Sequence, residues 1–184
     1  MKISIVTVVY NGAATIATAV DSVLAQDHPD VEYIVIDGGS KDDTVKILQN
    51  YGDKIAVLVS EPDKGIYDAM NKGVARATGD VVGILNADDF YTSGDVLSAV
   101  ARQLQESRAD ALIGDLIFVQ PHRLDHIVRY YSSKGFTIRK FERGDLPPHP
   151  TFFVRRKIYE QLGNFDTQYR MTADFDLMLR FLYI

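Results

Sequence analysis

Hydrophobic and polar residues alternate along the first half of the chain in a way that predicts strands and helices in succession. Short apolar runs bounded by polar residues are typical of buried strands, and apolar residues spaced three or four apart are typical of amphipathic helices. We expect strands over residues 3–9, 32–37, 55–60 and 80–85, and helices over residues 13–25, 43–51, 66–77 and 95–107. Strands that alternate with helices form right-handed βαβ units. The pattern therefore predicts an α/β fold with a mostly parallel, Rossmann-like central sheet flanked by helices.

The pattern changes after residue 108, where a small mixed region is expected. We expect one or two strands over residues 111–120, broken at Gly114 and Asp115, a strand over 151–154 and a helix over 157–162. Residues 121–150 are richer in charge, glycine and proline, and they end in LPPHP. Because no repeat, low-complexity tract or interdomain linker is present, residues 1–184 are predicted to form a single domain.

The last residues, 174–184, have helical spacing but end on an apolar run, FLYI, with no cap or polar tail. Helices normally close near glycine or basic residues. We therefore expect the chain to be truncated at its C-terminus. At the other end the chain enters a strand at Ile3 with no apolar region of signal length. No apolar stretch approaches the roughly 20 residues needed to span a bilayer.

Composition adds few constraints but excludes some chemistry. The chain has 184 residues, of which 46% are hydrophobic and 24% charged, and this is ordinary for a globular domain. The net charge of −5 and the pI of about 5.3 do not suggest a nucleic-acid-binding surface. Because cysteine is absent, disulfides, thiolate metal sites and cysteine nucleophiles are excluded.

The run VVGILNADDFY, residues 81–91, ends a predicted strand in two acidic residues. Ligands of open α/β sheets bind past the carboxyl ends of the strands. Alternate residues of an extended chain point the same way, so Asn86 and Asp88 could present two oxygens together. Mg²⁺ prefers such oxygen ligands and shares them with substrate phosphates. Taken alone, the motif is equally consistent with a turn that carries an acidic helix N-cap.

Two further strand ends carry acidic residues. Asp37 ends the second strand and is followed by two glycines, which allow a tight turn and close approach of the backbone to a ligand. A carboxylate there could accept hydrogen bonds from a nucleobase or a ribose, although a plain strand–turn–helix joint would also explain the glycines. After the third strand, Glu61, Asp63 and Lys64 lie around a turn. Three neighbouring strand ends with acids predict a ligand crevice.

Together, these segments resemble the family 2 glycosyltransferases, which have the GT-A fold. The matching segments are TVVYNG (7–12), IVIDGGSKDDT (34–44), SEPDKGIYDAMNKG (60–73), LNADD (85–89), HPTFFVRRKIYEQLGNFD (149–166) and MTADFDLMLR (171–180). Their order and spacing match the family along nearly the whole chain. The chain most resembles bacterial members that build exopolysaccharide or O-antigen repeat units.

The resemblance implies a binding site for a nucleotide-diphosphate sugar, with a UDP-sugar favoured. Thr7 and Tyr10 match positions that hold the nucleoside, Asp37 matches the acid that recognises the base, and Asp63 matches a further donor-side acid. Asp88 matches the metal-binding last position of the family's Asp-any-Asp motif. An Mn²⁺ or Mg²⁺ cofactor is therefore implied.

The chain departs from this motif at its first position, where Asn86 replaces the usual aspartate. An amide oxygen can ligate a metal or hold a metal-bound water, but it brings no charge, so a lower metal affinity is expected. His149 lies between prolines and matches a histidine that the family often has near the diphosphate. We expect it to act as a metal ligand or diphosphate contact.

Asp174 matches the family's catalytic base, and the resemblance implies inversion at the anomeric carbon. An acceptor hydroxyl has a pKa far above neutrality and needs a positioned carboxylate to take its proton. Ala173 stands where the family has a second acid. By position alone, Asp174 at the start of a helix could equally be an N-cap.

Other polar residues near these motifs are expected to be structural. Asp68 falls in the first turn of a predicted helix, where it would interact with the helix dipole, and Asn71 lies one turn further on. Asp176 is expected to be a solvated or capping acid. Arg155 and Arg156 could reach phosphates, but paired surface arginines are commoner.

These observations predict an enzyme that transfers a sugar to a hydroxyl of a glycan or lipid-linked acceptor. Residues 1–108 would bind the donor and residues 109–184 the acceptor. We expect a cytoplasmic location, no nucleic-acid partner, and peripheral contact with the inner face of the membrane where the acceptor is lipid-linked. The alternative is a non-catalytic nucleotide-sugar-binding module. A nucleotidyltransferase would need a basic triphosphate loop, which TVVYNG lacks.

Overall fold

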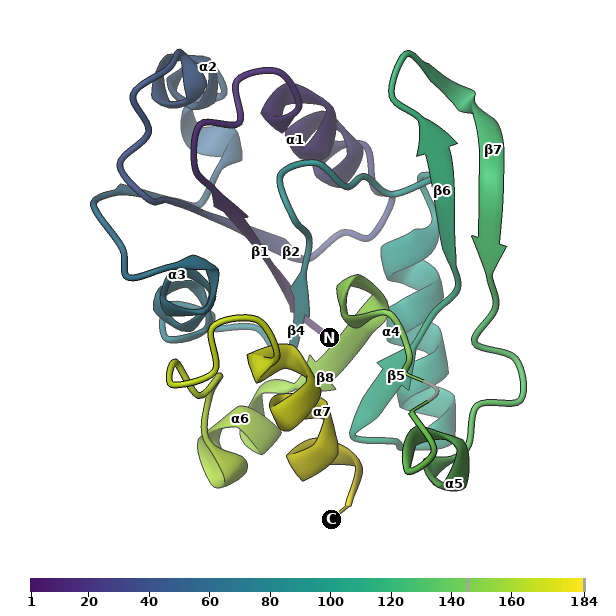
Figure 1. Ribbon diagram of the computed structural model, residues 1–184. Coiled ribbons are helices and arrows are strands. Elements are labelled where there is room, and N and C mark those ends of the chain that lie inside the picture. Colours follow the sequence, from purple (N-terminus) through teal and green to yellow (C-terminus); the bar gives the residue numbers. More distant parts are fainter. Residues whose placement is uncertain (145, 184) are drawn as a thin grey trace.

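The computed structural model describes residues 1–144 and 146–183, and a six-stranded mixed sheet lies at its centre (Figure 1). The strands of this sheet are Ile3–Val9 (β1), Val31–Asp37 (β2), Val57–Ser60 (β3), Val81–Ile84 (β4), Ala111–Ile113 (β5) and Phe152–Arg155 (β8). Their order is β3-β2-β1-β4-β8-β5, in which β1 to β4 are parallel and β8 is antiparallel to both of its neighbours. The predicted α/β class is confirmed.

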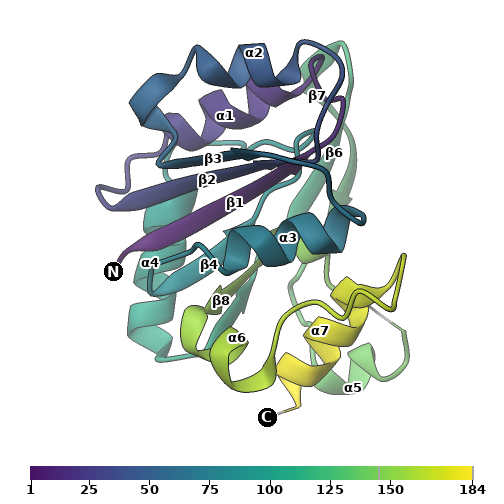
Figure 2. The same cartoon turned by 90° about the vertical axis from the view of Figure 1, so that its left-hand side faces the viewer.

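Helices cover both faces of the sheet. They are Ile16–Leu24 (α1), Thr44–Gln49 (α2), Ile66–Val74 (α3), Val96–Ser107 (α4), Ile138–Phe141 (α5), Arg156–Leu162 (α6) and Ala173–Leu182 (α7), with 3-10 turns at Gly52–Lys54 (η1) and His149–Thr151 (η2). Figure 2 shows α1 and α2 on one side of β1 to β3 and α3 on the other. Ile3 and Ile5 pack toward α1, α2 and α4, whereas Val6 and Val8 pack toward α3, α6 and α7. Because alternate residues of a strand face opposite ways, both faces of β1 are apolar and fully buried.

The strands and helices expected in the first half are all present, with small shifts at their ends. The first helix begins at Ile16 and not at residue 13, because residues 13–15 form a turn in which the Gly12 carbonyl accepts from the amide of Thr15. The strand and helix expected over residues 151–162 are present as β8 and α6. The helix expected at the C-terminus is α7, and its Phe181 is buried against Tyr159, with ring centroids 5.0 Å apart.

The sequence pattern assigns no element to residues 121–150, but the structure has a strand and a short helix there. Leu116–Gln120 (β6) and Arg123–Tyr131 (β7) form an antiparallel hairpin, which is a separate two-stranded sheet beside α4 (Figure 1). All residues of β7 except Tyr131 are exposed. Since β7 has no buried face, it carries no alternation of apolar and polar residues from which a strand could be predicted.

Among the residues described, no helix combines the length and the apolar character that crossing a membrane requires.

A buried carboxylate joins β1 and β2 to the turn before β4. Glu32 is 8% exposed, and it accepts from Lys2 Nζ at 2.8 Å, Ser4 Oγ at 2.6 Å and the Thr78 amide at 2.7 Å. Burial would raise the pKa of Glu32, but these donors outweigh burial and lower it to about 2. The charged form is therefore the one that stabilises the fold.

Glu32 predicts a specific loss of stability in acid. The folded pKa of about 2 lies below the ordinary glutamate pKa of 4.5, so the contribution of Glu32 to stability is present above about pH 4.5 and is lost as the pH falls toward 2. We expect Glu32→Gln to lower the free energy of unfolding at pH 7 by about 2 kcal/mol. In urea titrations the difference from the wild type should shrink below pH 4.5. Glu106→Gln, on the exposed side of α4, is the control and should change little at either pH. A Glu32→Gln effect of the same size at pH 7 and pH 3 would contradict the assignment.

Candidate active site

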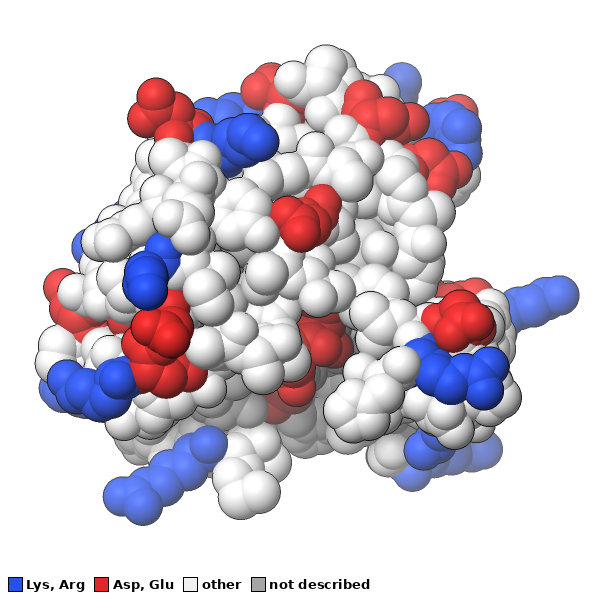
Figure 3. Space-filling model, turned by 90° about the horizontal axis from the view of Figure 1, so that it is seen from above, with Lys and Arg blue, Asp and Glu red and all other residues white. Residues whose placement is uncertain are grey.

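The sequence-predicted motifs meet at one edge of the central sheet. The parallel strands β1 to β4 have their carboxyl ends there, and the loops that follow contain Tyr10, Gly38, Asp63 and Asn86. Figure 3 looks down on the molecule from this side and shows acidic side chains in a hollow near the middle, with lysine and arginine side chains around the rim. This edge is where an open α/β sheet binds its ligand.

A cavity of about 330 Å³ lies between the end of β1, the loop after β3 and the start of α3. Its lining residues are Val8, Val9, Tyr10, Asp63, Gly65, Ile66 and Ala69. The Tyr10 ring is exposed, and Asp63 Oδ1 accepts from the Gly65 amide at 2.8 Å. A Cβ at Gly38 would clash with the Asp63 carboxylate, so glycine is needed there to leave room for it. Since small-molecule pockets begin at about 300 Å³, the cavity is large enough for a nucleoside.

Asp37 lies beneath this cavity and not on its surface. Its side chain is fully buried, and Oδ2 accepts from the amides of Gly39 and Ser40, each at 3.1 Å, and from Ser60 Oγ at 2.6 Å. The carboxylate thus organises the turn after β2 and ties it to the end of β3. In the structure, the Asp37 carboxylate thus stabilises the strand–turn–helix joint, which is the alternative role that the sequence allows.

Thr7 is not brought into the crevice either. Its side chain is fully buried in β1, and its hydroxyl accepts from Tyr33 OH at 3.1 Å. Of the two residues expected at the end of the first strand, only Tyr10 lines the cavity.

The LNADD loop forms a turn in which the Asp89 amide donates to the Asn86 carbonyl at 3.1 Å. Asn86 Nδ2 donates to Asp89 Oδ2 at 3.0 Å, whereas Asp88 is exposed. The following helix, α4, begins only at Val96, with Asp95 at its N-cap position. The alternative that these acids cap a helix is therefore wrong.

Asp174 receives hydrogen bonds from two parts of the chain that are distant in sequence. Tyr67 OH, on α3, donates to Asp174 Oδ1 at 2.9 Å, and His149 Nδ1, in η2, lies 3.2 Å from Asp174 Oδ2. Burial would raise the pKa of Asp174, but the bonds from His149 and Tyr67 outweigh it and lower the pKa to about 2. Burial and the neighbouring carboxylate raise the pKa of Tyr67 to about 12. Asp174 is consequently an ionised acceptor held by two donors, the Tyr67 hydroxyl and His149 Nδ1.

The contact with Asp174 also determines which ring nitrogen of His149 has no hydrogen-bond partner. With the proton on Nδ1, the lone pair is on Nε2, which is buried and has no hydrogen-bond partner among the residues described. Asn86 Oδ1 is buried and unpartnered in the same sense. His149 also lines a small cavity together with Ile84, the last residue of β4, which directly precedes the LNADD loop.

These donors suit a divalent cation only in part. In residues 1–144 and 146–183, no group of three or more His, Cys, Asp or Glu side chains is arranged to hold a metal ion. An imidazole nitrogen and an amide oxygen without partners, together with the exposed carboxylate of Asp88, could nevertheless ligate a cation whose other ligands are substrate oxygens or water. The residues therefore fit a metal held jointly with a substrate.

Tyr67 is the site residue that the sequence analysis missed. Its position in a helical apolar pattern is that of an ordinary core aromatic, and its ring does stack on Phe165, with centroids 5.6 Å apart. Only the Tyr67 hydroxyl reaches the site, and no pattern in the sequence indicates which residue it contacts.

The other polar residues that were expected to be structural make contacts within the fold. Asp68 accepts from the Lys64 amide at the start of α3, and Asp176 pairs with Arg180. Arg155 donates to the carbonyls of Leu104 and Ala109, and Arg156 donates to the carbonyl of Gly79, so neither guanidinium is used at the crevice.

Asn71 holds the segment before α7 against α3. Its Nδ2 donates to the Phe165 carbonyl at 2.8 Å, and its Oδ1 accepts from the Phe165 amide at 2.9 Å. The two bonds fasten the chain shortly before Asp174, so α7 starts at a defined place relative to Tyr67.

A mostly parallel sheet, an acidic crevice at its carboxyl edge and a carboxylate contributed by the second half define a transferase of the GT-A type. The sequence matches the model of the glycosyl transferase family 2 over residues 4–163, and the chain belongs to this family. As a member, it is a glycosyltransferase, a class of enzyme that takes its sugar from a nucleotide sugar.

Similar curated proteins include an uncharacterized glycosyltransferase of Mycobacterium tuberculosis, 33% identical over 180 residues, which covers 97% of this chain and 68% of the relative. A PGL/p-HBAD biosynthesis glycosyltransferase of Mycobacterium bovis is 32% identical over 182 residues, 96% of this chain and 68% of the relative.

Solved structures share the fold at lower identity. S. aureus TarS in complex with UDP-GlcNAc superposes with a TM-score of 0.79 at 20% identity, over 99% of this chain and 53% of that one. The mannosyltransferase PcManGT from Pyrobaculum calidifontis, in complex with GDP-Man and Mn²⁺, gives 0.71 at 22% identity, over 94% and 49%. The chain thus spans about half the length of these structures.

The Asn71 contacts generate a stability prediction. We expect Asn71→Ala to lower the free energy of unfolding by about 2 kcal/mol, because two half-buried hydrogen bonds are lost and two backbone groups are left unpaired. Asn71→Asp, which can accept but not donate, should fall between this variant and the wild type. Asn50→Ala, the same change at an exposed position, is the control in urea unfolding. If Asn50→Ala and Asn71→Ala cost the same, the two bonds do not stabilise the fold.

Proposed function

We propose that this chain is an inverting glycosyltransferase that moves a sugar from a nucleotide-diphosphate sugar to an acceptor hydroxyl, with Asp174 as general base. The observation that carries the proposal is the Asp174 carboxylate, ionised and held by Tyr67 and His149 near Ile84, at the carboxyl end of β4. Residues 1–108 would bind the donor and residues 109–184 the acceptor. The two reactants would meet beside His149 and Asp174.

The nucleoside of the donor would occupy the cavity lined by Tyr10 and Asp63. The exposed Tyr10 ring offers a surface for stacking a base, and the remaining lone pairs of Asp63 can accept from base or ribose. Asp37 would act indirectly, by holding the turn that contains Gly38. We favour UDP as the nucleotide. Structural relatives in complex with UDP, UDP-GlcNAc and GDP-Man support a nucleotide-sugar donor in general.

A divalent cation, Mn²⁺ or Mg²⁺, would be held by Asp88 and His149, with Asn86 as a neutral ligand or a partner of a bound water. When bound, such a cation supplies Lewis-acid stabilisation of the departing diphosphate. Support comes from the unpartnered lone pairs of His149 and Asn86, and from the Mn²⁺ in the PcManGT complex. Because Asn86 brings no charge, the free protein would bind the cation weakly and the donor phosphates would complete its coordination.

Transfer would proceed by a single displacement. The acceptor oxygen forms its bond to the anomeric carbon on the face opposite the diphosphate, while the bond to the diphosphate oxygen breaks and that oxygen keeps the electron pair. The acceptor proton passes to Asp174. A carboxylate whose pKa is about 2 is a weak base, so the proton would move late, once bond formation has made the hydroxyl strongly acidic. Tyr67 and His149 would keep the carboxylate aimed at that proton.

The acceptor would be a glycan or lipid-linked molecule of a bacterial surface polysaccharide. The PGL/p-HBAD biosynthesis glycosyltransferase among the relatives supports a role in assembling surface glycoconjugates. A cytoplasmic location, with peripheral contact to the inner face of the membrane where the acceptor is lipid-linked, belongs to the same proposal.

Asp174→Asn tests the base. The amide keeps its size and can still accept from Tyr67, but it cannot take a proton, so we expect kcat to fall at least about 10³-fold. UDP affinity, measured by titration calorimetry, should stay within about threefold. Asp176→Asn, two residues along the same helix, should keep most of its activity. Equal losses of transfer and of UDP binding in Asp174→Asn would contradict the assignment of Asp174 as the base.

Asp88→Ala tests the metal. We expect the variant to bind UDP with the same affinity in Mn²⁺ and in EDTA, because the charged ligand that links the cation to the diphosphate is gone. The wild type should bind at least about tenfold more tightly in Mn²⁺. Asp53→Ala, at an exposed turn far from the LNADD loop, is the matched control and should behave as the wild type. A full Mn²⁺ effect in Asp88→Ala would count against the metal role.

The alternative, a non-catalytic binding module, would show Mn²⁺-dependent UDP binding with no transfer to any acceptor.

A further inference from the structure

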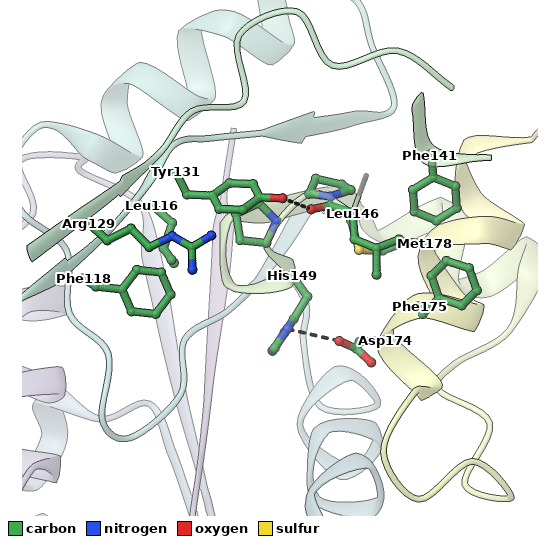
Figure 4. A pocket seen from close by; sticks show the side chains of 12 residues that line it. Leu116, Phe118, Arg129, Tyr131, Phe141, Leu146, His149, Asp174, Phe175 and Met178 are labelled. Atoms are coloured by element: carbon green, nitrogen blue, oxygen red, sulfur yellow. Dashed lines mark hydrogen bonds and ion pairs between the residues drawn. The ribbon is translucent and has the colours of Figure 1, made fainter. Parts of the chain in front are cut away.

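A second cavity, of about 230 Å³, opens directly over Asp174 (Figure 4). Its lining consists of Leu116, Phe118, Arg129, Tyr131, Phe141, Leu146, Pro147, Pro148, His149, Asp174, Phe175 and Met178. Figure 4 shows the hairpin side chains at one end, Phe141, Phe175 and Met178 at the other, and His149 and Asp174 between them. A cavity of about 150 Å³ is enough to hold benzene, so this one accommodates a single ring with its substituents.

The walls of this cavity offer few polar partners. Tyr131 OH already donates to the Leu146 carbonyl at 2.8 Å, and His149 and Asp174 are bonded to each other. At the far end Phe141 and Phe175 stack, with centroids 5.1 Å apart. A hexose ring would bring several hydroxyl groups against these apolar walls. Each one left unpaired and buried would cost about 1–3 kcal/mol.

One lining residue is charged and is offered to the cavity by the hairpin. Phe118 and Arg129 are directly paired across β6 and β7, as are Leu116 and Tyr131, so these four side chains share one face. The Arg129 guanidinium lies 5.7 Å from the ring centroids of both Phe118 and Tyr131. Figure 4 shows it between the two rings. In the described part of the chain, Arg129 forms no ion pair with a carboxylate.

We infer that this cavity selects an acceptor whose reacting hydroxyl is attached to an apolar ring or chain and which carries an anionic group. The apolar body would lie against Phe175, Phe141 and Met178, the hydroxyl would face Asp174, and the anion would pair with Arg129. Stacking holds the guanidinium plane in place, so little side-chain freedom is lost when it binds a carboxylate or phosphate. The inference rests on the proposed function, because it takes Asp174 as the base.

The test measures binding of three small probes in the presence of UDP and Mn²⁺. They are 4-hydroxyphenylacetate, its uncharged amide 4-hydroxyphenylacetamide, and methyl α-D-glucopyranoside, a ring of similar size with four hydroxyl groups. Dissociation constants are obtained by ligand-observed NMR titration. For the wild type we expect the acid to bind at least about fivefold more tightly than the amide, which is a modest gain for a charge-assisted pair. The glucoside should bind most weakly.

Arg129→Gln should remove the preference for the acid and leave the affinity for the amide within about twofold. Arg129→Lys should keep part of the preference, because it retains the charge but not the stacked plane. Arg123→Gln is the matched control, since Arg123 is on the same strand but is not part of the cavity wall. It should bind all three probes as the wild type does. Thermal unfolding verifies that each variant is folded.

Three results would overturn the inference: equal binding of acid and amide by the wild type, tightest binding of the glucoside, or the same loss in Arg123→Gln as in Arg129→Gln. UDP binding, recorded in the same samples, separates this inference from the proposed function. If UDP does not bind, the proposed function fails. If UDP binds but the probes are not discriminated, only the acceptor inference fails.

Discussion

The contact of Asp174 with Tyr67 and His149 is the interaction on which the rest of the site depends. It joins α3 of the first half, η2 of the second half and the start of α7, three segments that are far apart in the sequence. The same contact has two consequences. It keeps the carboxylate ionised, and it uses His149 Nδ1, so that the buried Nε2 is the ring nitrogen without a hydrogen-bond partner among the residues described. A carboxylate that fixes a histidine tautomer in this way is the usual support for a histidine metal ligand. The proposed base and the proposed metal ligand are therefore parts of one hydrogen-bonded unit, and their positions are linked.

On the proposed donor side of the crevice, the main feature is the close approach of the backbone at Gly38 to the Asp63 carboxylate. The Asp37 carboxylate accepts hydrogen bonds within its own turn. The next residue, Gly38, lies at the surface, where the absence of a side chain leaves room for Asp63. A residue expected to touch the ligand thus acts one layer below it. Such a buried carboxylate, satisfied by amides and a serine hydroxyl, makes the loop rigid, and a rigid loop loses little entropy when a ligand binds.

The proposed acceptor side includes side chains of the β6–β7 hairpin. The cross-strand register brings aromatic rings and an arginine onto the face that looks over Asp174. The hairpin projects from the central sheet with β7 almost wholly exposed, so its side chains are under little constraint from the core. An exposed element of this kind can change without disturbing the sheet or the proposed base. We regard this as the reason why Arg129 and the rings that stack on it lie on the hairpin and not on the strands of the core.

The sequence by itself determined the α/β class, the order of strands and helices in the first half, and the edge at which Tyr10, Asp63, Asn86 and Asp88 gather. These are consequences of local periodicity and of the rule that parallel strands end on one side, so they can be read without knowing any long-range contact. Only the tertiary structure decided the rest. It turned Thr7 and Asp37 inward, excluded a helix cap at the LNADD loop, revealed β7, and brought the Tyr67 hydroxyl to Asp174 from 107 positions away. The physical reason is the same in each case: whether a polar group meets a ligand or another part of the protein depends on what packs against it, and local sequence does not encode that partner.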